Sequence, residues 1–105
     1  AEVLLLSAIQ SCEAKLGRQH PLTLVSVNSL ALVFEAQEKF SDAEPLSRRA
    51  LEGNVKNNGA EHPHSILYVE NLGRLLQRQE KFTEAEELFR RALSLREKTS
   101  GPNDP

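Results

Sequence analysis

A few residues of this sequence have types and spacings that could carry chemistry. His62 and His64 lie one residue apart and could ligate a metal ion. Structural zinc sites use four ligands, however, so two histidines alone are a weak signal. His62 also has a counterpart, His20, 42 residues earlier, and both directly precede a proline. This recurrence favours a role at the start of a helix, and we expect neither a metal ion nor any other cofactor.

The single cysteine, Cys12, could act as a nucleophile. Its counterparts at the same 42-residue spacing are Asn54 and Arg96, and no histidine recurs beside it, as a Cys–His pair would require. The sequence also lacks a glycine-rich phosphate loop and a convincing acid–base pair. We therefore predict that the chain is not an enzyme. One cysteine cannot form an internal disulfide, which favours a reducing, cytoplasmic location.

The two arginine pairs at 48–49 and 90–91 could form a basic surface. The first arginine of each pair follows a glutamate by four residues, Glu44 or Glu86. Residues four apart are neighbours on a helix, so we expect surface ion pairs that contribute a few tenths of a kcal/mol each. The formal net charge is −2. Neither nucleic acid nor an anionic membrane surface is therefore an expected partner.

The elements that position these residues follow from an internal repeat. Residues 20–61 align without a gap on residues 62–103, and both segments contain QEKF and RRAL. Residues 1–19 continue the same spacing as the second half of a preceding repeat, and 104–105 would begin another. A fixed period of this length indicates supersecondary units stacked in an array. The 105 residues would then form one domain of stacked repeats.

Helices are the expected elements of each repeat. Apolar residues recur at i, i+3, i+4 and i+7, as in Val27, Leu30, Ala31 and Phe34. Prolines 21 and 63 suit the first turn of a helix, and glycines 17, 59 and 101 suit the residue after one. The fold class is therefore all-α. The predicted helices span residues 1–16, 21–37, 41–57, 63–79 and 83–99.

The second helix of each repeat begins with a capping-box pattern. Ser41 and Thr83 are each followed three residues later by a glutamate, Glu44 or Glu86. In a capping box the hydroxyl and the carboxylate each accept a hydrogen bond from a backbone N–H at the helix start. We therefore expect Ser41 and Thr83 to be N-caps.

These residues resemble the tetratricopeptide repeat, which pairs two helices, A and B. The matching residues are Leu72-Gly73, Phe82 and Ala85-x3-Phe89-x2-Ala92. The 42-residue period, the HP at the start of helix A and AEPLSRRAL in helix B are similar to the kinesin light chain and nephrocystin subclass. The resemblance covers the whole chain. It implies a right-handed α-solenoid with five helices in the order B-A-B-A-B.

One difference from the family concerns the turn between helices A and B. The family commonly has glycine there, whereas this sequence has Glu38 and Glu80. Glycine adopts backbone conformations that glutamate avoids. The tight geometry of this turn is therefore in question.

The resemblance implies a protein–protein interaction module, an adaptor or scaffold whose helices A line a concave groove for a peptide or partner protein. Carried onto this sequence, Asn28 and Asn71 would bind a peptide backbone, and Arg74 and Arg78 would pair with an acidic partner. The alternative is that both arginines belong to a solvated helix face, with Arg74 paired to Glu70. The candidate groove residues are Asn28, Ser29, Leu32, Glu35, Glu70, Asn71, Arg74, Gln77 and Arg78, with Val25, Ala36 and Leu67 beside them.

A mainly structural, self-associating segment without a peptide ligand is the second functional class. Terminal repeats normally carry a polar capping face, yet the first predicted helix is apolar at Val3, Leu5, Leu6 and Ile9. We expect association through these residues. The chain begins at Ala1 without a signal-like segment, so we also expect it to be part of a longer protein.

Overall fold

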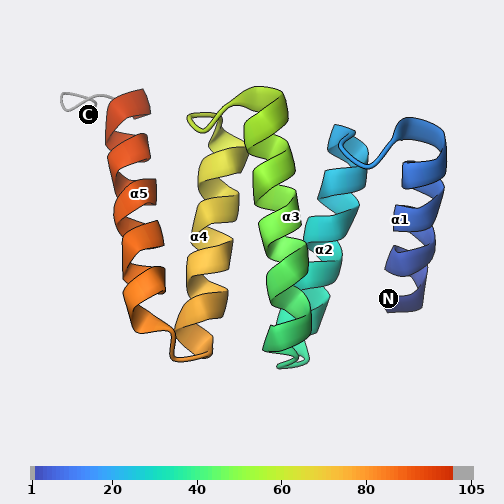
Figure 1. Ribbon diagram of the computed structural model, residues 1–105, viewed down its shortest axis with the longest axis horizontal. Helices are drawn as coiled ribbons and strands as arrows, with labels where there is room; N and C mark the ends of the chain where they lie inside the picture. Colours follow the sequence, from blue (N-terminus) through green and yellow to red (C-terminus); the bar gives the residue numbers. More distant parts are fainter. Residues whose placement is uncertain (1, 101–105) are drawn as a thin grey trace.

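The computed structural model describes residues 2–100, which form five α-helices joined by short turns (Figure 1). The all-α prediction is confirmed: no strand occurs in this part of the chain. The predicted helix end at Gly101 and the predicted repeat start at 104–105 lie outside the described residues. The helices are α1 (Glu2–Leu16), α2 (Pro21–Ala36), α3 (Phe40–Asn58), α4 (Pro63–Arg78) and α5 (Phe82–Ser100).

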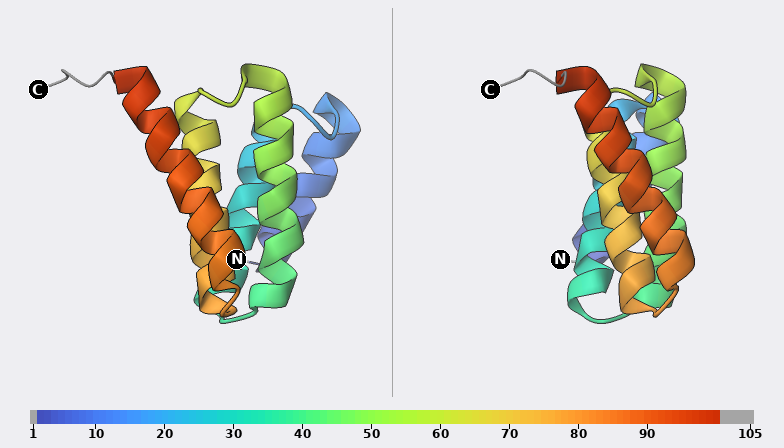
Figure 2. Two further views of the ribbon diagram at one scale, coloured as in Figure 1. Left: turned by 60° about the vertical axis from the view of Figure 1, so that its left-hand side comes forward. Right: turned by 90° about the vertical axis from the view of Figure 1, so that its left-hand side faces the viewer.

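The helices stack in chain order, each packed against the next (Figure 1). Seen end-on, α2 and α4 form one layer, and α3 and α5 form the other (Figure 2). Successive helices therefore alternate between the two layers, as helix A and helix B alternate in a repeat array. None of the helices described is long and apolar enough to cross a membrane.

Histidines cap both helices of the first layer, as predicted. The Nδ1 atom of His20 accepts a hydrogen bond from the Leu22 N–H at 3.1 Å, and that of His62 accepts one from the His64 N–H at the same distance. A proline follows each histidine at the first helical position, where its missing N–H would have no partner in any case. His62 is thus explained by the fold alone.

The predicted N-caps of α3 and α5 are wrong. Both helices begin earlier, at Phe40 and Phe82, and Lys39 caps α3 without a side-chain hydrogen bond. The helix starts early because the preceding turn is so short that the Lys39 carbonyl already accepts from the Ala43 N–H at 3.0 Å. Ser41 therefore lies inside the first turn of the helix rather than before it.

The tight turn between helices A and B is retained without glycine. Glu38 and Glu80 adopt left-handed backbone conformations, with φ of 60° and 62°. The next N–H, from Lys39 or Lys81, closes the turn on a carbonyl of the preceding helix at 2.8 or 2.9 Å. A left-handed L-residue costs roughly 1–2 kcal/mol, and the packing of the two helices must offset this cost.

The core follows the predicted apolar stripes. Val27, Leu30, Val69, Leu72 and Leu76 are at most 2% exposed. They join the two layers into one cluster that also includes residues of α1, α3 and α5. The repeat therefore supplies the same core positions from successive helices.

Of the residues predicted for self-association, Ile9 belongs to this core and is 6% exposed, so the prediction is wrong for Ile9. Leu5 is partly buried and packs against the cluster. The two lie four residues apart, on the face of α1 that turns inward. Val3 and Leu6 are exposed, and so is Leu4, which the sequence pattern did not single out and which is 75% exposed. Association through Val3 and Leu6 stays a prediction.

Candidate functional site

The predicted groove residues lie on the two helices of one layer. Asn28, Ser29, Leu32 and Glu35 belong to α2, whereas Glu70, Asn71, Arg74, Gln77 and Arg78 belong to α4. The structure brings four of the nine together: Glu35, Asn71, Arg74 and Arg78. The others are spread along the same two helices.

The centre of this cluster is an ion pair between α2 and α4. Arg74 Nε donates to Glu35 Oε2 at 2.6 Å, and Arg74 Nη2 donates to Glu35 Oε1 at 2.9 Å. Glu35 is 6% exposed, so this two-fold pairing satisfies a carboxylate that would otherwise be buried without a partner. The hydrogen bonds that Arg74 donates to Glu35 raise the pKa of Arg74.

Asn71 and Arg78 flank the ion pair. Asn71 is buried, and its Oδ1 accepts from Arg74 Nη1 at 3.4 Å. Arg78 Nε lies 4.0 Å from Glu35 Oε2, and its guanidinium lies 5.5 Å from the ring centroid of Phe40. The Arg78 side chain is half-exposed. The Arg74 side chain is 43% exposed, but three of its five N–H groups are engaged by Glu35 and Asn71, so Arg78 has more N–H groups available to a ligand.

Glu70 does not join the cluster. Its carboxylate accepts hydrogen bonds from Arg96 of α5, at 2.9 Å from Nε and 2.6 Å from Nη2. These hydrogen bonds lower the pKa of Glu70. The alternative pairing of Glu70 with Arg74 is therefore wrong, because Glu70 forms its ion pair with Arg96 and Arg74 forms its ion pair with Glu35.

Exposed apolar side chains accompany the charged cluster. Asn28 and Ser29 are partly buried, whereas the neighbouring Leu32 is 40% exposed. Together these side chains define a surface that we call the α2/α4 face. It comprises Leu22, Val25, Asn28, Ser29, Leu32 and Glu35 on α2, and Leu67, Asn71, Arg74 and Arg78 on α4.

The other candidates from the sequence stay apart from this face. The rings of His62 and His64 meet edge to face with centroids 5.2 Å apart. Across residues 2–100, no group of three or more His, Cys, Asp or Glu side chains is placed to hold a metal ion. Cys12 is partly buried on α1 and borders a small hollow with Lys15 and Leu16.

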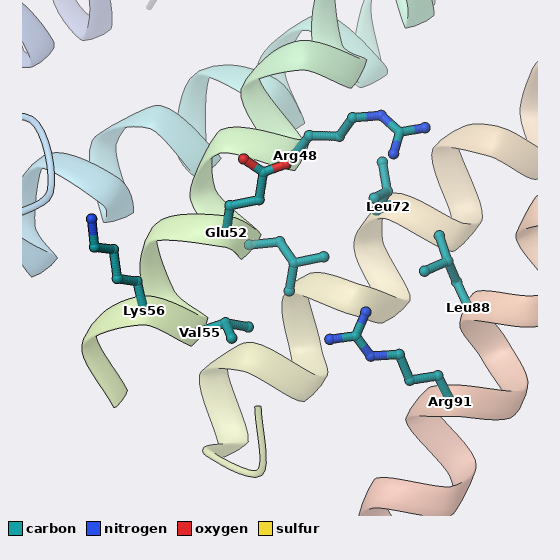
Figure 3. A pocket seen from close by; sticks show the side chains of 8 residues that line it. Arg48, Glu52, Val55, Lys56, Leu72, Leu88 and Arg91 are labelled. Carbon is teal, nitrogen blue, oxygen red and sulfur yellow. The ribbon is translucent and has the colours of Figure 1, made fainter. Parts of the chain in front are cut away.

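A further hollow, which sequence reasoning did not find, lies in the other layer. It has a volume of about 370 Å³ and opens between α3 and α5, with Leu72 of α4 at its base (Figure 3). Leu51 and Val55 of α3 and Leu88 of α5 form its apolar walls. An apolar hollow of this size is in the range of small ligand sites.

Comparisons with known proteins agree with this architecture. A sequence profile described as tetratricopeptide repeat matches residues 23–64 and 69–105. The fold also matches a crystal structure of the nearly identical TPR-like repeats ascribed to a kinesin light chain of Podosopora anserina, with a TM-score of 0.86 and 24% sequence identity. A single-residue variant of that protein gives the same values. A search of curated proteins found no match.

The two solved structures are longer than this chain. The alignment covers 98% of the chain but 50% of each solved structure, so the chain spans about half their length. At this level of identity the likeness establishes the fold.

Proposed function

The chain belongs to the tetratricopeptide repeat family, whose members generally mediate protein interactions, and we propose that it is an adaptor or scaffold module that binds a peptide or partner protein on its α2/α4 face. Stacked repeats of this kind present extended surfaces built from equivalent helices. The chain would therefore act by recognition rather than by chemistry of its own.

The observation that carries this proposal is the composition of the α2/α4 face. Leu32 and Leu67 are 40% and 43% exposed, on adjacent helices, and lie on the same face as the ordered Glu35–Arg74 pair. Exposed apolar side chains next to fixed polar groups are typical of protein-binding surfaces. Such a surface binds a peptide by apolar contact and orients it by hydrogen bonds.

The geometry also refines the roles expected from the sequence. Because Arg74 is held by Glu35, it would support the surface rather than bind a ligand carboxylate. Arg78, which is half-exposed, would bind an acidic side chain of the partner. Asn28, which is partly exposed, would hydrogen-bond the peptide backbone, whereas the buried Asn71 has its Oδ1 oriented toward Arg74.

Affinity capture with quantitative mass spectrometry tests the proposal. The bait proteins are the wild type, the double variant Leu32→Ser with Leu67→Ser, and the control Leu16→Ser. Leu16 is 44% exposed on α1, away from the α2/α4 face. Two apolar contact residues at an interface together contribute more than about 1.4 kcal/mol to the binding free energy. Recovery of a true partner should therefore fall about tenfold in the double variant.

The control variant should retain the partners that the double variant loses. Thermal unfolding followed by circular dichroism would verify that all three proteins are folded. Equal recovery of every captured protein by the wild type and the double variant would contradict binding through the α2/α4 face.

A second candidate function is self-association, which the exposed ends of the array favour. Val3 on α1 is 77% exposed, and Phe82 and Leu93 on α5 are 59% and 60% exposed. Apolar side chains exposed to this degree at both ends could join copies of the chain. This candidate would make the chain a structural segment without a peptide ligand.

A further inference from the structure

The 42-residue repeat places two equivalent pairs of positions along the layer of α1, α3 and α5, and each pair could form an ion pair between neighbouring helices. Position 13 of α1 recurs as 55 on α3 and as 97 on α5, and these positions hold Glu13, Val55 and Glu97. Arg49 of α3 recurs as Arg91 of α5. A glutamate at the first position could pair with the arginine of the next helix in this layer. Glu13 and Arg49 offer such a pair between α1 and α3, whereas Val55 replaces the glutamate between α3 and α5.

The first of these pairs is formed. Glu13 of α1 accepts a hydrogen bond from Nη2 of Arg49 on α3. Both side chains are largely covered, with 26% of the glutamate and 21% of the arginine exposed. The counterparts of Leu51 and Leu72 in this repeat are Ile9 and Leu30, and both are buried. In this repeat, a carboxylate of the chain itself occupies the place beside the arginine.

The second pair is incomplete because Val55 stands where Glu13 stands in the first. Among residues 2–100, no carboxylate lies within 4.0 Å of the Arg91 guanidinium. Arg91 is exposed, and Figure 3 shows its guanidinium extending from α5 toward α3, across the mouth of the hollow. The structure therefore presents a cation whose counterpart in the preceding repeat binds a carboxylate.

The remaining charged groups around the hollow do not supply that carboxylate. Arg48 is already paired with Glu44 at 3.0 Å and with Glu84 at 2.8 Å. Glu52 has its carboxylate beside the stem of Arg48 rather than near Arg91, and Lys56, which also lines the hollow, directs its amine away from Arg91 (Figure 3). Arg91 is thus the basic group directed over the apolar walls.

We propose that this hollow binds an acidic peptide segment of a partner protein, which presents one carboxylate to Arg91 and an adjacent leucine-like side chain to the apolar walls. The carboxylate would take the place that Glu13 takes beside Arg49. The apolar side chain would contact Leu51, Val55 and Leu88 above Leu72. Charge-assisted pairing would set the orientation, and apolar burial would supply contact area. The site is separate from the α2/α4 face, so it stands independently of the function proposed above.

Titration with two defined peptides tests the chemistry of the site. The probes are an acetylated, fluorescently labelled pentapeptide with a leucine between two pairs of glutamates, and its counterpart with glutamines. We expect the glutamate peptide to shift the NMR signals of Val55, Leu88 and Arg91 and to bind about tenfold more tightly, because a hydrogen bond to a charged group contributes about 1.5–3 kcal/mol. Equal binding of both peptides, or shifts confined to the α2/α4 face, would overturn the proposal.

Variants at position 55 test the site at a partly buried side chain that packs against the edge of the core cluster. Val55→Glu supplies the missing carboxylate from the chain itself, so it should pair with Arg91 and weaken binding of the glutamate peptide about tenfold. Val55→Gln, which is similar in size but uncharged, should weaken binding less. If Val55→Glu binds as tightly as the wild type, the proposal is wrong.

The first repeat offers a matched gain-of-function variant. Glu13→Val releases Arg49 and reproduces the second hollow over Ile9 and Leu30, so it should raise the number of glutamate-peptide sites from one to two. Arg91→Gln added to this variant should leave one site, now at Arg49. A folded Glu13→Val protein that still binds one peptide would show that the repeat equivalence does not define the site. Isothermal titration calorimetry measures the stoichiometry in each case.

Discussion

Glu35 and Arg74 show how a pair of side chains can define a surface before any ligand arrives. The glutamate is buried on α2, and the arginine reaches it from α4 with two hydrogen bonds. A buried carboxylate requires such a partner because its desolvation is costly. The pair therefore fixes the relative position of the two helices that carry the α2/α4 face.

Substitution of Arg74 should therefore destabilise the fold. We expect Arg74→Ala to lower the free energy of unfolding by about 1–2 kcal/mol, after discounting for the partial exposure of the arginine, because Glu35 would lose both charge-assisted hydrogen bonds. Arg74→Lys should recover part of the loss, since lysine keeps the charge but not the paired geometry. Urea unfolding measures both effects.

Arg78→Ala is the matched control for this prediction. Arg78 lies on the same helix, but only at 4.0 Å from Glu35, and it is half-exposed. Its removal should change stability by less than about 1 kcal/mol. If Arg78→Ala costs as much as Arg74→Ala, the pairing with Glu35 is not the source of the stability.

Few of these side-chain contacts could be predicted from the sequence. Arg74 and Glu35 lie far apart in the chain and meet only after α2, α3 and α4 have packed. The sequence pattern placed both on one face, but the only partner within the chain that it offered Arg74, as the alternative to an acidic ligand, was Glu70. Residues four apart on one helix are the only neighbours that spacing reveals. The missing carboxylate beside Arg91 could be detected in the repeat alignment, because Val55 stands at a position that holds glutamate in the other two copies, Glu13 and Glu97.

At the scale of the helices, Glu44 links α3 to the turn that begins α5. It accepts hydrogen bonds from Gln79 at 2.8 Å, from Lys81 at 3.1 Å and from Arg48 at 3.0 Å. Burial of Glu44 opposes its ionisation, but the three donors outweigh burial and lower its pKa below the ordinary value of 4.5. The sequence pattern predicted the pairing with Arg48, which is confirmed, but also predicted that Glu44 would cap its own helix, which is wrong.

This arrangement predicts that stability depends on pH. A carboxyl group with a pKa lower in the folded than in the unfolded protein contributes stability above its unfolded value, and the contribution disappears as the pH falls through the folded value. Unfolding free energies measured by urea titration should therefore decrease from pH 6 to pH 4 and below. Glu70, whose pKa is also lowered, adds to the same trend.

Glu44→Gln isolates the contribution of Glu44. The amide keeps the size of the side chain but cannot ionise, so the variant should be less stable than the wild type at pH 6, and the difference should shrink as the pH falls below 4.5. If the difference in unfolding free energy between the two proteins is the same at pH 6 and below pH 4.5, the charge of Glu44 does not stabilise the fold.

The helices themselves were largely predictable, for reasons that are local. Apolar spacing, the 42-residue repeat and the positions of proline and glycine together predicted all five, and His20 with the following proline marked the start of α2. The starts of α3 and α5 were missed because Glu38 and Glu80 adopt a left-handed conformation that their residue type disfavours. Tertiary packing decides that geometry. The division into repeat units at 20–61 and 62–103 stays a prediction.

At the scale of the whole molecule, the two ends of the stack differ from its middle. Leu51 and Leu93 occupy equivalent positions in the repeat, yet Leu51 is 6% exposed and Leu93 is 60% exposed. The helix α4 follows α3 and packs against it, whereas none of the helices described covers the outer face of α5. Phe82 and Leu93 thus form an apolar surface with the character of an internal interface.

We therefore expect the isolated chain to self-associate, with an average mass that rises with concentration in sedimentation equilibrium. Leu93→Glu should weaken the association about tenfold or more, because it places a charge in an apolar contact. Ser94→Glu, on the same helix and exposed, adds the same charge outside that surface and should have little effect. If α1 also lies in the contact, Val3→Glu should weaken the association further when it is added to Leu93→Glu, since Val3 is 77% exposed at the opposite end of the stack. A wild-type protein that sediments as a monomer at every concentration would contradict association through either end.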